Sequence, residues 1–176
     1  HTFRLAASDF LDPLFLPTLV AQVQAAAPEC RIEIHPLSAS THYQAALAHG
    51  DLDVVIGNWL QPPEDLHIGR LFDDAVVCLV GAEHPAVRRG WTLDDWLQAG
   101  HVAPTPTYPG ALGIIDEHLE GMGLRRNIRV RCPHFALVPA MVASSLLVLT
   151  TGRQFCERFL PENGGLLPVR MLPCPV

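Results

Sequence analysis

The first 57 residues alternate between short apolar runs and stretches in which apolar positions recur every three or four residues. Short apolar runs are typical of strands, and the longer period is typical of helices that bury one face. The pattern predicts strands over residues 3–7, 31–37 and 52–57, separated by helices over residues 12–27 and 41–49. This β-α-β-α-β order is typical of a parallel sheet with helices on its faces.

The predicted helices carry boundary signals of their own. Asp12 followed by Pro13 is typical of an N-cap and a first helical position, and Gly50 is placed to end the second helix. One face of the first helix is apolar, and its residues are Leu16, Leu19, Val20, Val23 and Ala27. Residues 52–57 are almost uninterruptedly apolar, which favours a strand covered on both sides of its sheet.

A second series of elements follows Pro62-Pro63. Two strands are predicted over residues 66–72 and 75–81, and the Asp73-Asp74 pair between them is too short for a crossover helix. We therefore expect the chain to pass from one lobe to another at this point.

The α/β alternation then resumes, beginning with Thr92-x-x-Asp95, which has the spacing of a capping box. Helices are predicted over residues 92–98, 111–121, 135–143 and 152–160, and strands over residues 101–104, 128–132 and 146–150. Residues 165–169 are expected to return to the first lobe. This assigns residues 1–74 and 166–176 to lobe I and residues 75–165 to lobe II.

Composition narrows the class of protein. With 176 residues, 49% of them apolar and 17% charged, the chain can fold as one domain or two small lobes. A formal charge of -6 argues against nucleic-acid binding by this chain. Five cysteines without close pairs favour reduced thiols in a cytoplasm. Because no apolar run is long enough to cross a bilayer, we expect no membrane contact and a cytoplasmic location.

Residue types that support catalysis or metal binding lack the spacing that such sites need. Nine His and five Cys include no C-x-x-C and no H-E-x-x-H, so we expect no metal and no cofactor. There is no G-x-S-x-G, and Ser144-Ser145 is better explained as a turn. Asp73-Asp74 and Asp94-Asp95 are better explained as a turn and a helix cap. We therefore expect no catalytic residue and a protein that is not an enzyme.

A basic run, Arg125, Arg126, Arg129 and Arg131, favours nucleic-acid contact more than any other segment does. Arg129 and Arg131 would share one face of the strand predicted over residues 128–132. No aromatic side chains interleave with them to stack on bases. We interpret the run as the solvated edge of a sheet.

Polar turns follow several of the predicted strands. They are Ser8-Asp9-Phe10, Ser38-Ala39-Ser40, Gly57-Asn58 and Thr105-Pro106-Thr107. Each turn alone is equally well explained by helix capping. As a set they predict two sheet edges that face each other, where hydroxyl and N–H groups can hold a carboxylate or phenol.

Several segments resemble the effector-binding domain of LysR-type transcriptional regulators over essentially the whole chain. FRLAASD and LPTLVAQVQAAAPECRIEI are similar to the first β-α-β of that family, HGDLDVVIG to its G-x-L-D passage, and GAEHPAV to its H-P passage. The segment from His134 to Ala143 is most similar to the subgroup of nodulation and aromatic-catabolism regulators.

The resemblance implies a two-lobed, periplasmic-binding-protein-like (type 2) α/β fold with a mostly parallel sheet in each lobe. It implies a small effector between the lobes and self-association as a dimer, or a tetramer in the full-length protein. DNA would be bound only through an amino-terminal winged helix-turn-helix that this sequence does not contain, and the family's last stretch is also largely missing. Where many members have a Gly-rich turn, this chain has Ala143-Ser144-Ser145-Leu146, which fits the same subgroup.

Carried over by position, the four polar turns fall on the family's effector cleft. His134 and Phe135 fall where the aromatic-responsive subgroup lines its cavity, so the resemblance implies that Phe135 stacks on an aromatic ring and His134 donates to a phenolate or carboxylate. The same two-lobed scaffold leaves two alternatives open. One is a periplasmic solute-binding protein that serves a transporter, and the other is a prephenate-type dehydratase with Asp9 as its acidic group.

Overall fold

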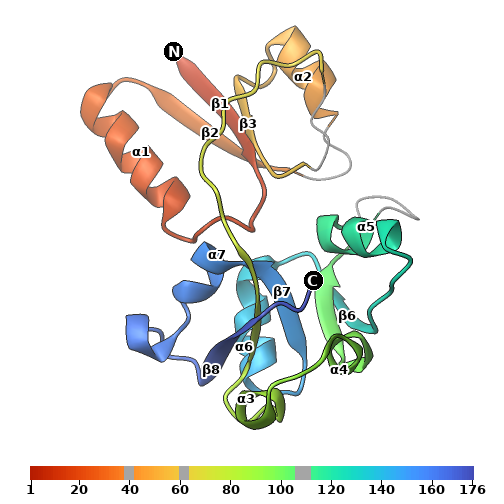
Figure 1. The fold of residues 1–176 in the computed structure, drawn as a ribbon. Helices are drawn as coiled ribbons and strands as arrows, with labels where there is room; N and C mark the ends of the chain where they lie inside the picture. The colour runs from red at the N-terminus through yellow and green to blue at the C-terminus, as the bar shows by residue number, and fades with distance from the viewer. Residues whose placement is uncertain (38–41, 60–63, 106–111) are drawn as a thin grey trace.

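The computed structural model describes residues 1–37, 42–59, 64–105 and 112–176. Figure 1 shows two bodies, one above the other, each built around a sheet, and we refer to them as the first and the second lobe. The first sheet contains β1 (Thr2–Ala7), β2 (Arg31–Pro36) and β3 (Val54–Ile56). The second contains β4 (Val76–Gly81), β5 (His101–Pro104), β6 (Ile128–Cys132), β7 (Val148–Gly152) and β8 (Val169–Pro173). The predicted α/β class is confirmed.

The first sheet is parallel, with β1 in the middle of the order β2-β1-β3. Leu5 aligns with Ile34 of β2 on one side and with Val54 of β3 on the other. The connections are α1 (Phe15–Ala26) and α2 (Tyr43–His49), and α2 ends at Gly50 in the left-handed conformation, with φ 76°. The predicted β-α-β-α-β order is confirmed, although the expected start of the second helix at Thr41 lies outside the described residues.

Helix α1 begins at Phe15 and not at Pro13. The Asp12 carboxylate accepts the N–H of Leu14 at 2.9 Å and so holds a turn before the helix. Pro17 consequently lies in the first helical turn, where its missing N–H would have had no partner. No residue of α1 is buried, and among the described residues of this lobe the buried apolar ones are Leu5, Ala6, Ala7 and Leu52.

Residues 64–75 contain no strand, so the strand predicted over residues 66–72 is wrong. This segment crosses from one lobe to the other, where no neighbouring strand offers hydrogen-bond partners (Figure 1). Its apolar side chains Ile68, Leu71 and Phe72 are exposed. The apolar run therefore predicted a strand here, but a strand needs a neighbouring strand to pair with, and this segment has none among the described residues.

The second sheet has the order β6-β5-β7-β4-β8, in which only β4 runs against its neighbours. Residues 166–176 were expected in the first lobe, and that assignment is wrong for β8. Leu79 of β4 aligns with Met171, so β8 pairs antiparallel with β4 and extends the second sheet. The apolar character of this strand predicted burial but could not identify which sheet it joins.

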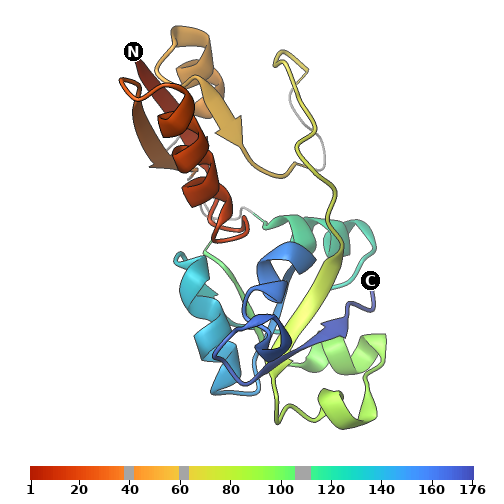
Figure 2. The same cartoon turned by 90° about the vertical axis from the view of Figure 1, so that its left-hand side faces the viewer.

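Short helices cover the second sheet on both faces (Figure 2). They are α3 (Ala86–Arg89), α4 (Leu93–Gln98), α5 (Ile114–Gly121), η1 (Phe135–Leu137), α6 (Val138–Ala143), α7 (Arg153–Glu157) and η2 (Pro161–Asn163). The capping box predicted at the start of α4 is confirmed, because Thr92 and Asp95 each accept the backbone N–H of the other. The sequence pattern did not predict α3.

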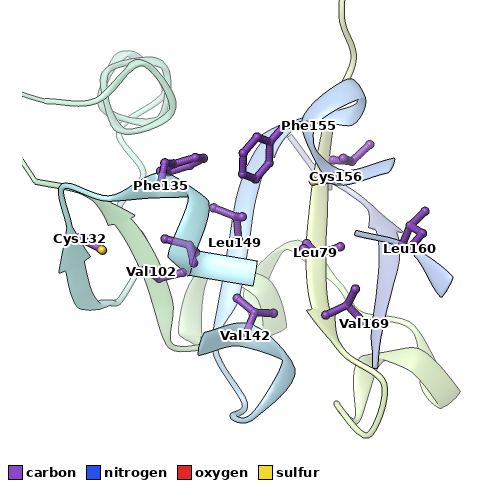
Figure 3. Packing of buried hydrophobic residues seen from close by; sticks show 12 residues of the cluster. Leu79, Val102, Cys132, Phe135, Val142, Leu149, Phe155, Cys156, Leu160 and Val169 are labelled. Carbon is purple, nitrogen blue, oxygen red and sulfur yellow. The ribbon is translucent and has the colours of Figure 1, made fainter. Parts of the chain in front are cut away.

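The main hydrophobic core lies in the second lobe. One cluster, shown in Figure 3, packs α6 and α7 against one face of the sheet, with Leu79, Val102, Val142, Leu149 and Phe155 buried. A second cluster includes Cys78, Val80, Trp96, Leu119 and Val148. Because successive residues of β4 alternate between these clusters, the strand is covered on both sides. The second lobe is therefore the stable base of the molecule.

His101 is a fully buried polar residue in this base. Its Nε2 donates to the backbone oxygen of Trp96 at 2.6 Å, and its ring meets the Trp96 indole edge-on at 4.8 Å. Burial lowers the pKa of His101 to about 4. The His101 imidazole is therefore neutral in the folded protein. A second buried polar contact lies nearby, where the Arg126 guanidinium donates to the Asp116 carboxylate through Nε at 2.6 Å and through Nη2 at 3.1 Å.

This burial predicts a loss of stability in mild acid. An unfolded histidine titrates near 6.5, so between about pH 6.5 and pH 4 the unfolded chain binds one more proton than the folded chain. The free energy of unfolding should fall over this window by roughly 3 kcal/mol from His101 alone. In His101→Gln the amide can still donate to Trp96 and does not titrate. Urea unfolding at pH 7 and pH 5 should show a smaller acid loss in this variant than in the wild type.

His118→Gln is the matched control, because His118 lies exposed on α5. It should keep the wild-type dependence on pH. Equal acid losses in His101→Gln and the wild type would contradict the assignment of a buried neutral imidazole.

Candidate functional site

The carboxyl ends of the parallel strands in the two lobes face one another. In Figure 1, β1 and β3 descend from the upper lobe toward the edge at which β5, β6 and β7 of the lower lobe end. Two backbone hydrogen bonds hold the chain just beyond these strand ends. The Ser8 N–H donates to the oxygen of Ile56 at 3.3 Å, and the Thr105 N–H donates to the oxygen of Cys132 at 3.4 Å. Ligands of α/β sheets collect at such edges, so we take the facing ends as the candidate site.

A hydrogen bond joins the two edges directly. The N–H of Phe135, at the start of η1, donates to Asp9 Oδ2 at 2.7 Å across the lobes. Both residues belong to the set that the sequence predicted, and the structure brings them together. An N–H bond to a carboxylate is stronger than one between neutral groups. Asp9 therefore positions the lobes relative to each other.

Aromatic rings continue this contact into the core. Phe10 meets Phe135 edge-on at 4.4 Å, Phe135 lies 5.3 Å from Phe155, and Phe155 lies 5.1 Å from Phe159. Phe135 is only 2% exposed, whereas Phe10 is 38% exposed. In this arrangement an incoming ring would meet Phe10 before it could reach Phe135.

A second bridge between the lobes is ionic. Arg158, directly after α7, donates through Nε to both carboxylate oxygens of Asp12 at 2.9 Å. The sequence pattern predicted that Asp12 caps a helix, and it assigned no role to Arg158. No spacing rule connects residues so far apart in the chain, so only the folded arrangement reveals the pair.

Helix α7 is also tied to the segment that crosses between the lobes. The Asp74 carboxylate accepts the N–H of Gln154 at 3.2 Å, and Arg153 N–H donates to the oxygen of Ala75 at 2.9 Å. A side chain at Gly152 would collide with Asp74, because a Cβ there would lie 2.3 Å from its carboxylate. The Asp73-Asp74 turn therefore anchors the start of the same helix that Arg158 follows.

The other predicted site residues lie at or near this edge with free surface. Ser8 is partly buried, and Asn58, Thr105 and His134 are exposed. Five predicted members lie outside the described residues, namely Ser38, Ala39, Ser40, Pro106 and Thr107.

An aromatic pair beside the first lobe's edge was not predicted. The rings of Tyr43 and Trp59 lie 5.6 Å apart, and the Trp59 indole packs over Gly57. A Cβ at Gly57 would lie 2.6 Å from that indole, so a larger residue would require the Trp59 ring to move. The sequence signal was available, since Trp59 directly follows the predicted Gly57-Asn58 turn.

Other candidate chemistry does not gather at this edge. Among the described residues, no group of three or more His, Cys, Asp or Glu side chains is arranged to hold a metal. A hollow of about 480 Å³ lies elsewhere, at α3 and α4, and its lining includes His84, Arg89 and Trp91. His84 has a structural role there, because its Nδ1 accepts the N–H of Ala86 at 3.2 Å.

The basic run separates into two kinds of arginine. Arg125, Arg129 and Arg131 are exposed, as predicted for a solvated edge. Arg126 is buried, with its side chain only 2% exposed in the ion pair with Asp116, so it does not belong to that surface. In the described part of the chain, no helix is long and apolar enough to span a bilayer.

Comparison with known proteins gives a consistent relationship. Residues 1–176 match the family described as the LysR substrate binding domain. The HTH-type transcriptional activator NahR of Pseudomonas putida is 32% identical over 150 residues, covering 85% of this chain and 49% of NahR. Nodulation protein D 2 of Sinorhizobium fredii is 26% identical over 174 residues, covering 97% of this chain and 55% of that protein. The chain spans about half the length of these curated relatives.

Solved structures agree on the fold. A probable transcriptional regulator of Pseudomonas aeruginosa superposes with a TM-score of 0.83 at 26% identity, covering 99% of this chain and 57% of that one. The regulatory domain of MexT, a transcriptional activator in the same species, gives 0.73 at 20% identity, with 99% and 81% covered. The BenM effector binding domain with its effector benzoate gives 0.68 at 20% identity, with 98% and 76% covered.

The aromatic contact between the lobes predicts a stability effect. Phe135→Ala removes a buried ring that touches both Phe10 and Phe155, and such truncations destabilise by about 3–5 kcal/mol. Urea unfolding at neutral pH checks this value. Leu137→Ala, two residues on and 54% exposed, should change stability by less than about 1 kcal/mol. Equal effects of the two substitutions would contradict the packing described for Phe135.

Proposed function

The chain belongs to the LysR substrate-binding domain family, and from this premise we propose that it senses a small aromatic carboxylate for a transcriptional regulator. The observation that carries the proposal is the junction at which Asp9 and Phe10 of the first lobe meet Phe135 of the second. A molecule that enters between the facing strand ends would change this junction, and with it the relative position of the lobes.

The polar end of the effector would be held by neutral donors and by histidine. Ser8 and Thr105 carry hydroxyl groups at the two edges, and the exposed His134 offers an imidazole N–H. Asp9 is unsuited to hold an anion directly, because its own carboxylate is negative and already accepts the N–H of Phe135. Ser38, Ala39, Ser40, Asn58, Pro106 and Thr107 remain proposed members of the same site.

The aromatic end would first meet Phe10. Its ring keeps 38% of its surface exposed while its edge contacts Phe135. Stacking on Phe135 would require Phe10 to move, which would also disturb the neighbouring Asp9 contact. Aromatic contacts of this kind contribute about 0.5–1.5 kcal/mol beyond the buried area. Benzoate is a suitable first compound, since the BenM domain is described with benzoate as its effector.

The response would be a shift between two arrangements of the lobes. A ligand moves such an equilibrium only through its different affinity for the two states. The Asp9–Phe135 and Asp12–Arg158 contacts hold the lobes in the arrangement described above. An effector that replaces or strengthens the Asp9–Phe135 contact would change the relative position of the lobes.

The rest of the regulator is part of the proposal. We infer that the full-length protein binds DNA through a helix-turn-helix segment, as the names of its HTH-type relatives state for them. It would associate as a dimer or tetramer in the cytoplasm and carry out no chemistry on the effector. The bond between Asp9 and Phe135 gives that carboxylate a positioning role, which favours sensing over a dehydratase.

Isothermal titration of the purified chain with benzoate, salicylate and a flavonoid tests the proposal. We expect at least one of these to bind with a stoichiometry near one. Thr105→Val removes a hydroxyl donor and should weaken binding about three- to tenfold, the worth of one hydrogen bond. His134→Ala removes the imidazole donor and should weaken binding by a similar factor.

Matched controls are available far from the strand ends. Thr2→Val lies at the opposite end of β1, and His49→Ala lies at the far end of α2, so both variants should bind as the wild type does. A folded chain that binds none of the compounds would contradict an aromatic effector. Binding that Thr2→Val and Thr105→Val weaken equally would contradict the proposed site.

A further inference from the structure

Two cysteines far apart in sequence lie on one face of the second sheet. Cys78 is the third residue of β4, and Cys174 directly follows β8. The antiparallel register aligns Cys78 with Leu172, so Cys174, two residues further along, projects from the same face. The two positions are diagonal neighbours, and a hydrogen bond between the two thiols brings their side chains together.

The two thiols differ in how deeply they are buried. Cys78 is fully buried, and its Sγ accepts the indole N–H of Trp96 at 3.2 Å and lies 3.5 Å from the hydroxyl of Thr150. Cys174 packs against the same cluster but is only partly buried. A small solute can therefore reach Cys174, whereas Cys78 is protected from direct attack.

The acidity of the thiols follows the same division. Interaction with the thiol of Cys78 lowers the pKa of Cys174 to about 7, while burial raises the pKa of Cys78. Burial likewise raises the pKa of Cys156 to about 12. At neutral pH a substantial fraction of Cys174 is thiolate, which is the reactive form.

We propose that Cys174 and Cys78 form a peroxide-sensitive thiol pair, with Cys174 as the thiol that is oxidised and Cys78 as the thiol that resolves it. The Cys174 thiolate attacks one oxygen of a hydroperoxide, the O–O bond breaks, and Cys174 becomes a sulfenic acid while the other oxygen leaves as hydroxide or alkoxide. Cys78 then attacks the Cys174 sulfur. An S–S bond forms, the S–O bond breaks, and the sulfenic hydroxyl takes the proton of the Cys78 thiol and leaves as water.

The bond would join the end of β8 to β4 close to the point where β4 leaves the crossing segment. Cys174 lies beyond the last paired residue of β8, so the chain there can adjust to disulfide geometry without breaking the ladder. A link between distant parts of the sequence restricts the unfolded chain strongly, so oxidation should raise the melting temperature by roughly 5 °C or more. The proposal needs no effector and stands independently of the proposed function.

Treatment of the reduced chain with hydrogen peroxide at pH 7, followed by non-reducing peptide mapping by mass spectrometry, tests the proposal. We expect a cross-linked peptide containing Cys78 and Cys174, lighter than its parts by two hydrogen atoms. Cys174→Ser should abolish the cross-link. In Cys78→Ala, the sulfenic acid at Cys174 should form more slowly, because the neighbour that lowers its pKa is gone, but without a resolving thiol it should persist and be trapped by dimedone.

Cys30 provides the internal control, because it is also partly buried but lies in the first lobe without a thiol neighbour among the described residues. Alkylation of Cys174 by iodoacetamide should rise with pH through about 7, and near pH 7 it should be faster than alkylation of Cys30. If Cys78→Ala does not fold, the wild-type map and the alkylation profile still decide. Absence of the Cys78–Cys174 peptide, or equal rates of alkylation at Cys174 and Cys30 near pH 7, would overturn the proposal.

Discussion

The N–H of Phe135 has its partner in the other lobe. Asp9 accepts this bond at 2.7 Å, and the ring of Phe135 is closed between Phe10 of the first lobe and Phe155 of the second. A buried N–H without an acceptor is costly, so the second lobe completes its hydrogen bonding only when the first lobe is in place. This requirement links the packing of the core to the relative position of the lobes.

Electrostatic contacts support the same arrangement from the side of α7. Asp74 in the crossing segment accepts an N–H at the start of this helix, and Arg158 after its end binds Asp12 of the first lobe. Exposed ion pairs contribute little each, so this bridge orients the lobes more than it stabilises them. A ligand of modest affinity could therefore change their arrangement without opposing the main core.

Much of the fold follows from the sequence pattern, and the exceptions have physical causes. The periodicity of residues 3–56 predicted three strands and two helices, and Thr92 and Asp95 predicted a capping box. The pattern failed where the outcome depends on a distant partner. The run over residues 66–72 finds no strand to pair with, and β8 joins the second sheet because β4 offers it a free edge.

At the candidate site too, the local sequence pattern predicted some residues, whereas others depend on contacts with distant parts of the chain. Polar turns after strands marked Asp9 and Thr105, because the carboxyl ends of parallel strands follow from local pattern. The roles of Asp12 and Arg158 depend on a contact between lobes that no local pattern contains. Phe135 was predicted through a family resemblance as a surface for a ligand, whereas the structure shows its ring packed against Phe10 and Phe155.

Titration of the ¹⁵N-labelled chain with benzoate, followed amide by amide, tests most directly whether the facing strand ends receive the effector. We expect the largest shifts at Ser8 to Phe10, Thr105, His134 and Phe135, with little change around His84 and Trp91 at the hollow beside α3 and α4. Shifts concentrated at that hollow, with the Phe135 amide unchanged at saturation, would contradict it.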